Sequence, residues 1–272
     1  MNQTNLCSFF GYTRQGYAKN LKLQQIRLEK HRIAVSVVQE IRAEQPRVGA
    51  RKMFDDVNHR LLLAGYSPLG RDQLFDVLRD RDMLVKPLKR FTRTTNSYHR
   101  FRTHKNLLKK IVQTGPNQAY AADITYLCLP DGFCYLSLLS DVYSRKIVGY
   151  YLAKDLKAEG PIKALRMALN QCPNSQGVIH HSDRGIQYCC DEYAKILEKN
   201  NMHISMTEEN HCYENAIAER INETLKYDLM LGEVLPSYKI ARRIVKQAVY
   251  IYNQKRKHVS LGYVTPNLKH AA

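Results

Sequence analysis

Three acidic residues far apart in the chain have the types and settings that could bind divalent metal ions. Asp123 lies in the apolar run AADITYLCL, Asp183 follows VIHHS, and Glu219 lies on a periodic segment after SMTE. There are 59 residues between the first two acids and 35 between the last two. A carboxylate among apolar neighbours is costly to bury unless it is paired or binds a metal. Three converging carboxylates suit Mg²⁺, which also keeps phosphate oxygens as ligands, so the chemistry would be two-metal phosphoryl transfer.

The patterns around these acids predict the elements that position them. The alternation in ADITYLCLP predicts a strand, the turn Pro130-Asp131-Gly132 predicts a hairpin, and FCYLSLLSDVY and KIVGYYLA continue the antiparallel sheet. A helix over 161–171 and the strand VIHHS follow, and Gly185 turns the chain into the helix CDEYAKILEKN. The short strand HISMTE then precedes the helix of Glu219. This mixed order predicts an α/β fold with a central sheet flanked by helices.

Spacing alone leaves the choice of acids open, because the chain has 25 acidic residues and most such residues are exposed. On the last helix, Asn215, Glu219, Glu223 and Lys226 share one face, so Glu223 is the nearest rival to Glu219. On residue type alone, Lys226 would pair with Glu223 or have a solvated tip.

Several motifs in order resemble one family over nearly the whole chain. They are ADITYL, HSDRGIQY, SMTEENHCYENAIAER, INETLKYDL and YNQKRKHVSLGYVTP. Together they resemble the second-reading-frame (OrfB) transposases of the insertion-sequence family numbered three, within the DDE transposase and retroviral-integrase superfamily. Two positions differ from the family pattern: Tyr120 stands where a Trp is common, and Glu214 where an Asp precedes Asn215-Ala216.

The resemblance implies a fold, an activity and a site. The fold is a ribonuclease-H-like, integrase-type catalytic core preceded by a helical, helix-turn-helix-like domain. The activity is metal-dependent cleavage and strand transfer of DNA at insertion-sequence ends, with Asp123, Asp183 and Glu219 as catalytic residues and ligands of two Mg²⁺ ions, for which Mn²⁺ would substitute. No covalent protein intermediate is needed. An inactive or regulatory DNA-binding relative, and a related nuclease, are the alternatives.

The resemblance also implies partners. These are double-stranded DNA, both as terminal inverted repeats and as target, and further copies of the chain, because two ends must be brought together. Members usually act fused by frameshifting to an upstream helix-turn-helix protein.

The charge of the chain supports a polyanionic partner. The formal net charge is +17, and residues 1–116 hold 23 Lys and Arg against 9 acids, while residues 117–272 hold 19 against 16. Between Met83 and Ala122 there is no acid, and the segment interleaves cations with aromatic residues, which is typical of an extended linker along phosphates. We therefore divide the chain into a helical region at 1–84, a basic linker at 85–114 and a catalytic core at 115–272, with a basic C-terminal helix and tail.

The front region has the periodicity of three helices. Apolar residues at three- and four-residue steps predict a helix over 19–45, which Pro46 ends. A second helix follows Gly49 and stops at Gly65, and a third begins at Arg71 after YSPLG. Helices joined by such a turn allow a helix-turn-helix, although a plain helical bundle fits the periodicity equally well, and the resemblance favours the former.

A set of cations is expected to contact DNA. Arg184, beside Asp183, would steady a phosphate or face solvent. The full set is Lys226, Arg184, Arg51, Lys52, Arg71, Lys89, Arg90, Arg93, Arg100, Arg102, Lys255, Arg256 and Lys257.

The cysteines and the hydropathy indicate the compartment. Seven cysteines without a CxxC pair favour reduced thiols over a disulfide framework or a zinc ribbon. The chain has no signal-peptide core and no apolar run of membrane-spanning length. We expect a cytoplasmic, nucleoid-associated bacterial protein that has no contact with a membrane.

Overall fold

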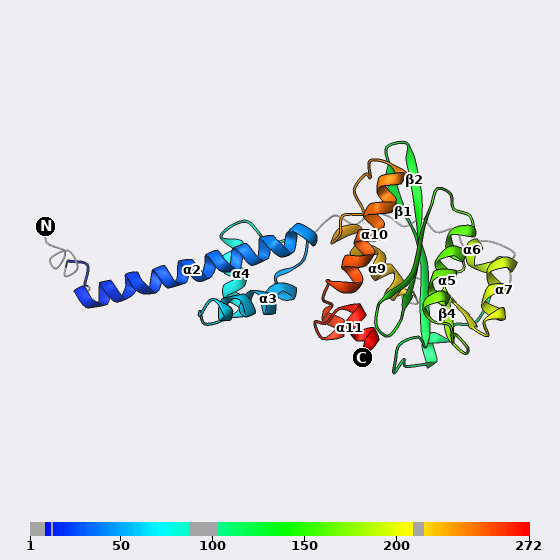
Figure 1. The fold of residues 1–272 in the computed structure, drawn as a ribbon, viewed down its shortest axis with the longest axis horizontal. Coiled ribbons are helices and arrows are strands. Elements are labelled where there is room, and N and C mark those ends of the chain that lie inside the picture. Colours follow the sequence, from blue (N-terminus) through cyan, green and yellow to red (C-terminus); the bar gives the residue numbers. More distant parts are fainter. Residues whose placement is uncertain (1–8, 12, 87–102, 209–214) are drawn as a thin grey trace. The chain divides into compact units, whose positions relative to one another are not determined.

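A computed structural model describes residues 9–11, 13–86, 103–208 and 215–272. Contacts divide the chain into two compact units, Met1–Pro87 and Leu88–Ala272 (Figure 1). Most of the predicted linker falls outside the described residues, so its boundaries stay a prediction. No helix in the described parts is both long enough and apolar enough to span a bilayer.

The first unit is helical. It contains α2 (Arg14–Glu44), α3 (Ala50–Leu63) and α4 (Arg71–Arg79). Helix α2 begins earlier than its apolar periodicity predicts, because the Thr13 hydroxyl caps it by accepting the N–H of Gly16. The buried side chains of α2 are Ala34, Val37 and Val38, all in its second half, and they pack against α3 and α4.

A side-chain clamp shapes the turn between α3 and α4. The Asn58 side chain accepts the N–H of Leu69 at 2.8 Å and donates to the Leu69 carbonyl at 3.2 Å. Gly65 takes a positive φ of 78°, which a glycine adopts without strain. Helix, turn and helix thus follow in the predicted order.

The second unit is built on a five-stranded mixed sheet in the order β3-β2-β1-β4-β5. The strands are β1 (Ala119–Leu129), β2 (Gly132–Asp141), β3 (Ile147–Ala153), β4 (Ile179–Ser182) and β5 (His203–Met206). The first three pair antiparallel as a meander, whereas β4 and β5 run parallel to β1. Strand β4 pairs with only the first residues of β1, Ala119 to Ala121. The rest of β1 therefore lacks β4 as a neighbour.

Helices cover both faces of this sheet (Figure 1). Helices α5 (Glu159–Gln171) and α7 (Asp191–Lys199) lie on one face, with the short α6 (Ile186–Cys189) before α7. Helices α9 (Ala216–Tyr227) and α10 (Tyr238–Gln254) lie on the other, and α11 (Pro266–Ala271) follows. The 3₁₀ turns Leu108–Lys110 and Val259–Leu261 complete the described elements.

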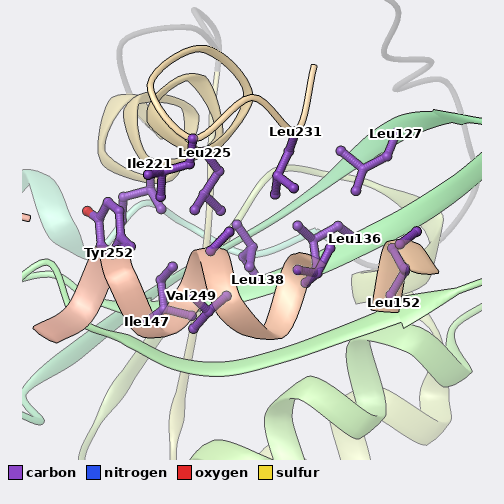
Figure 2. Packing of buried hydrophobic residues seen from close by; sticks show 14 of the residues in the cluster. Leu127, Leu136, Leu138, Ile147, Leu152, Ile221, Leu225, Leu231, Val249 and Tyr252 are labelled. Atoms are coloured by element: carbon purple, nitrogen blue, oxygen red, sulfur yellow. The ribbon is translucent and has the colours of Figure 1, made fainter. Parts of the chain in front are cut away.

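Each face has its own apolar core. Figure 2 shows the core beneath α9 and α10, where Ile221, Leu225 and Val249 meet Leu136 and Leu138 of β2. On the opposite face, α5 approaches β3 so closely that a Cβ at Gly149 would lie 2.1 Å from the carbonyl oxygen of Ala164. The predicted α/β class, a mixed sheet between helices, is confirmed.

Candidate active site

Asp123 lies on β1 just beyond the last residue that pairs with β4. Its side chain is partly buried and held at both oxygens. Oδ1 accepts the N–H of Ile124 at 2.9 Å, and Oδ2 accepts from Asn222 Nδ2 at 2.7 Å. The carboxylate is therefore oriented from its own strand and from α9.

Asp183 is the first residue after β4, as the sequence predicts. The N–H of Gly185 donates to Asp183 Oδ1 at 3.0 Å, and α6 begins directly afterwards. A Cβ at Gly185 would lie 2.9 Å from that oxygen. A side chain at position 185 would displace this carboxylate oxygen, so the glycine preserves the orientation of Asp183.

Glu219 occupies the first turn of α9, where its N–H donates to the carbonyl of Asn215. The rival acid Glu223 is exposed and lies 3.7 Å from Arg220 in an i,i+3 ion pair. Glu219 acts electrostatically on Asp123, as described next, and it remains the better candidate for the third ligand.

Asp183 and Glu219 are both close enough to Asp123 to perturb its ionisation. Burial, followed by the charge of Asp183, raises the pKa of Asp123 to about 7, and the charge of Glu219 acts in the same direction. The hydrogen bonds from Asn222 and Ile124 oppose this rise. A carboxyl whose ionisation is held back by like charges is a good place for a cation, because a bound cation removes the repulsion.

The donor set therefore suits a hard divalent metal. Carboxylate oxygens are the ligands that Mg²⁺ prefers. The described His, Cys, Asp and Glu side chains do not form a ready-made group of three ligands. Two of the carboxylate oxygens are engaged by Asn222 and Gly185, as given above, and like charges keep neighbouring carboxylates apart.

Asn222 is a site residue that reasoning from the sequence missed. It lies one turn after Glu219 on α9, is 6% exposed, and holds Asp123 across 99 positions of the chain. Asn215 at the start of the helix also reaches β1, donating to the Ala122 carbonyl at 2.9 Å. No local signal in the sequence identifies the contact with Asp123, because the two partners lie 99 positions apart.

Tyr188 was also missed as a site residue, although its motif was singled out. It lies on α6, is 3% exposed, and its hydroxyl has no hydrogen-bond partner among the described residues. Burial raises its pKa well above the usual value, and the charges of Asp123 and Asp183 add to the rise. The phenol is thus an uncharged donor beside two of the acids.

Lys226 lies over an aromatic ring on β1. Its Nζ is 4.2 Å from the centroid of the Tyr126 ring. Burial lowers the pKa of Lys226, while the charge of Asp123 opposes that effect. Arg184 donates from Nε to the Thr207 carbonyl at 2.7 Å, which ties the turn after β4 to the end of β5.

The other predicted DNA contacts fall in different settings. Arg51 on α3 is exposed and Lys52 is half-buried, while Arg71 begins α4 and pairs with Asp72. Lys89, Arg90, Arg93, Arg100 and Arg102 lie outside the described residues.

The three basic residues after α10 differ in their exposure to solvent. Arg256 is only 6% exposed and forms an ion pair with Asp228, so its guanidinium joins two segments of the fold. Lys255 is exposed and Lys257 half-buried. Of the three, Lys255 is the most accessible to a polyanion.

This sheet, with an acid on its central strand, a second after the neighbouring strand and a third on a covering helix, defines the integrase-core class of proteins. Two families described as integrase core domain match residues 113–212 and 200–266. Among solved structures, the simian T-cell lymphotropic virus intasome, in complex with PP2A regulatory subunit B56 gamma, shares the fold with a TM-score of 0.52. The match covers 79% of this chain and 70% of that chain at 16% identity.

Proteins with similar sequences identify the family within this class. The uncharacterized 31 kDa protein of insertion element IS600 from Shigella sonnei is 32% identical over 271 residues, 96% of each chain. Transposase InsF for insertion sequence IS3A, from Escherichia coli strain K12, is 32% identical over 222 residues, covering 81% of this chain and 75% of the relative. The chain belongs to the DDE transposases of the insertion-sequence family numbered three (IS3). The resemblance drawn from the motifs is confirmed.

Proposed function

We propose that this protein cuts DNA at the ends of an insertion sequence and joins those ends to new DNA, using divalent metal ions held by Asp123, Asp183 and Glu219. Mg²⁺ suits these oxygen ligands, and Mn²⁺ would substitute for it. Two such ions would stabilise the attacking and leaving oxygens of an in-line displacement at phosphorus.

One observation carries this proposal. The pKa of Asp123 is raised to about 7 by burial together with the charges of Asp183 and Glu219. These acids come from β1, the end of β4 and α9, so the fold gathers negative charge that a purely structural carboxylate would avoid.

The surrounding residues have defined tasks in this proposal. Asn222 fixes the rotation of the Asp123 carboxylate and favours its ionised form. Gly185 holds one oxygen of Asp183 by its N–H and leaves room for it by lacking a Cβ. The neutral Tyr188 hydroxyl offers a donor within the site. The nucleophile, first water and then a strand 3′-hydroxyl, attacks phosphorus directly, and the leaving oxygen departs with the other strand segment.

The test uses purified protein with labelled DNA ends and Mg²⁺. We expect Asp123→Asn, Asp183→Asn and Glu219→Gln each to lower strand cleavage and joining at least a hundredfold, the order lost when an electrostatic group acting at the reacting centre is removed. Binding of the same DNA, measured without metal, should remain. Glu223→Gln is the matched control, since Glu223 is an exposed acid on the same helix that pairs with Arg220.

Other outcomes would favour other functions. If Glu223→Gln abolishes joining and Glu219→Gln does not, the third ligand is misplaced. Hydrolysis of the RNA in RNA–DNA hybrids without joining would indicate a nuclease, and binding without any cutting would indicate a regulatory DNA-binding protein.

The DNA partner and the assembly are part of the proposal. Terminal inverted repeats and target DNA would be bound by several copies of the chain, with the predicted cations along the phosphates, in the cytoplasm at the nucleoid. Because both ends must meet, the protein bound to two ends should run as a multimer in gel filtration. If joining needs a frameshift-fused upstream protein, adding that fusion will restore activity that this chain lacks alone.

A further inference from the structure

Two exposed aromatic rings stand together on the β1–β2 hairpin. Tyr126 is 39% exposed and Phe133 is 54% exposed. Their ring centroids lie 5.4 Å apart with the planes at 81°. In the register of the hairpin, Tyr126 faces Tyr135 and Phe133 faces Cys128, so the two rings are diagonal neighbours on one face. Each keeps apolar surface in contact with water.

The pair is adjacent to the candidate active site. Tyr126 follows Asp123 by three residues on β1, in the part of the strand that β4 does not pair with, so the two side chains leave opposite faces of this strand. Lys226 connects the two, because its ammonium lies over the Tyr126 ring and interacts with the charge of Asp123. Lys226, on α9, therefore links the acid on one face of β1 to the aromatic pair on the other.

The backbone after α9 holds Lys226 in place. The N–H of Gly232 donates to the Lys226 carbonyl at 3.0 Å, and a Cβ at Gly232 would lie 3.1 Å from that oxygen. Three residues later, the N–H of Leu235 donates to the Cys128 carbonyl on β1 at 2.9 Å. The backbone of Lys226 is thus fixed beside β1, and its side chain carries the ammonium to the Tyr126 ring.

We propose that Tyr126 and Phe133 form a stacking platform for an unpaired base of the DNA strand whose phosphate reacts at the acids. This platform rests on the proposed function and assigns a further subsite to it. Aromatic side chains bind unpaired bases of any sequence through their faces, whereas bases inside a duplex offer only their edges. Lys226 suits the phosphate of the same nucleotide, and its move from the ring to a phosphate would free a face of Tyr126.

The experiment uses a DNA duplex with a single-stranded end in which 2-aminopurine replaces one base at a time, mixed with metal-free protein. Stacking on an aromatic ring quenches this fluorophore. We expect quenching at one or two positions near the cleavage site with wild type, its loss in Tyr126→Ala and Phe133→Ala, and its retention in Tyr126→Phe. Affinity for the single-stranded end should fall about tenfold in the alanine variants, which corresponds to the loss of one stacked base. Affinity for a blunt duplex should not change.

Tyr250→Ala is the matched control. Tyr250 is an exposed tyrosine on α10, 56% accessible, with Lys255 Nζ 5.9 Å from its ring centroid. Equal quenching in wild type and Tyr126→Ala, or an equal loss in Tyr250→Ala, would overturn the platform. So would parallel losses of affinity for blunt and single-stranded ends.

The platform and the proposed function can fail separately. The quenching assay needs no strand joining, so a protein that stacks the base and never joins strands retains the platform and loses the transposase activity. A protein that joins strands equally well with Tyr126→Ala and Phe133→Ala, without quenching, retains the activity and loses the platform.

Discussion

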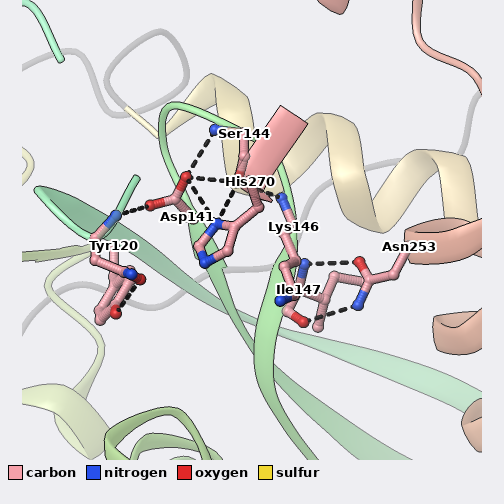
Figure 3. A network of polar contacts seen from close by, with 8 residues as sticks. Tyr120, Asp141, Ser144, Lys146, Ile147, Asn253 and His270 are labelled. Carbon is pink, nitrogen blue, oxygen red and sulfur yellow. Dashed lines mark hydrogen bonds and ion pairs between the residues drawn. The ribbon is translucent and has the colours of Figure 1, made fainter. Parts of the chain in front are cut away.

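Two acids at neighbouring places in the sheet show how the same side chain serves two purposes. Asp141 ends β2, is 0% exposed, and accepts from the N–H of Asn117 and from both the N–H and hydroxyl of Ser144 (Figure 3). Burial would raise its pKa, but the nearby His270 and the hydrogen bonds from Ser144 and Asn117 lower it. Asp123 has two hydrogen bonds and like charges nearby, and its pKa rises to about 7. A carboxylate whose charge is stabilised by hydrogen-bond donors stabilises the fold, whereas a carboxylate close to like charges favours the binding of a cation.

The largest expected effect is a loss of folding stability when Asp141 is replaced. Asp141→Asn should lower the free energy of unfolding by about 3 kcal/mol, since an amide cannot accept from all three buried donors. The lowered pKa of Asp141 means that its contribution is present above the unfolded value of about 3.9 and is lost as the pH falls through the folded value. Urea unfolding at pH 7 and pH 3 will measure this. A loss that does not shrink in acid would contradict the proposed role of the charge.

In the metal-free protein, Asp123→Asn should instead raise the free energy of unfolding. With a pKa raised to about 7, folded Asp123 keeps a proton that the unfolded chain releases from about pH 4 upward. Wild-type stability therefore falls as the pH rises from about 4 to 7, and the amide removes that loss. We expect a gain of about 2 kcal/mol at pH 8 and little change at pH 4, after allowance for the partial exposure of the side chain.

Thermal unfolding at both pH values will show the gain. Added Mg²⁺ should stabilise wild type at pH 8 more than Asp123→Asn, because the variant lacks one of the three carboxylate ligands. If the variant is less stable than wild type at pH 8, the acids are not opposing one another.

The sequence predicts the elements that hold the three acids, but it does not predict the asparagine side chain that contacts Asp123. Alternation places Asp123 in a strand, the Asp-Arg-Gly turn places Asp183 at a strand end, and helical periodicity places Glu219 on α9. All three elements are present in the structure. Asn222 could not be assigned in this way, because its partner lies 99 positions away and depends on how α9 crosses β1. Contacts across the fold leave no local signal.

Charge runs were harder to interpret than apolar patterns. The run Lys255 to Lys257 reads as one basic surface, but its middle residue turns inward to Asp228, a partner 28 positions away. Helix α4 ends at Arg79 for a local reason: Asp82 takes a positive φ of 52°, and the N–H of Met83 turns back to the Leu78 carbonyl at 2.7 Å.

Asn222→Ala tests how Asp123 is tuned. The Asn222 bond lowers the pKa of Asp123, so its removal raises that pKa further above 7 and leaves less carboxylate at neutral pH. Strand cleavage should fall about tenfold at pH 7, equivalent to about one pKa unit, and recover toward pH 8.5. The measurement is the pH–rate profile, whose acid limb should shift to higher pH.

Asn253→Ala is the control for this change. Asn253 bonds both the N–H and the carbonyl of Ile147 at 2.9 Å (Figure 3), at the start of β3, two strands away from β1 in the sheet. Its loss should lower stability without moving the profile. An unchanged profile in Asn222→Ala would reduce that residue to a packing role.

The smallest expected effect concerns the far side of the Asp141 network. The Ser144 hydroxyl gives its hydrogen to Asp141 at 2.6 Å, so it must accept from His270 Nδ1, 2.9 Å away on α11. His270→Ala removes that bond and the 3.7 Å contact between His270 Nδ1 and Asp141 Oδ1, but leaves the three donors from Asn117 and Ser144 on Asp141. We expect a loss of less than about 1 kcal/mol in urea unfolding, with cleavage unchanged, against His203→Ala on the exposed start of β5 as a control. A loss as large as that of Asp141→Asn would mean that the histidine charge, rather than the backbone and hydroxyl donors, holds the buried carboxylate in its ionised form.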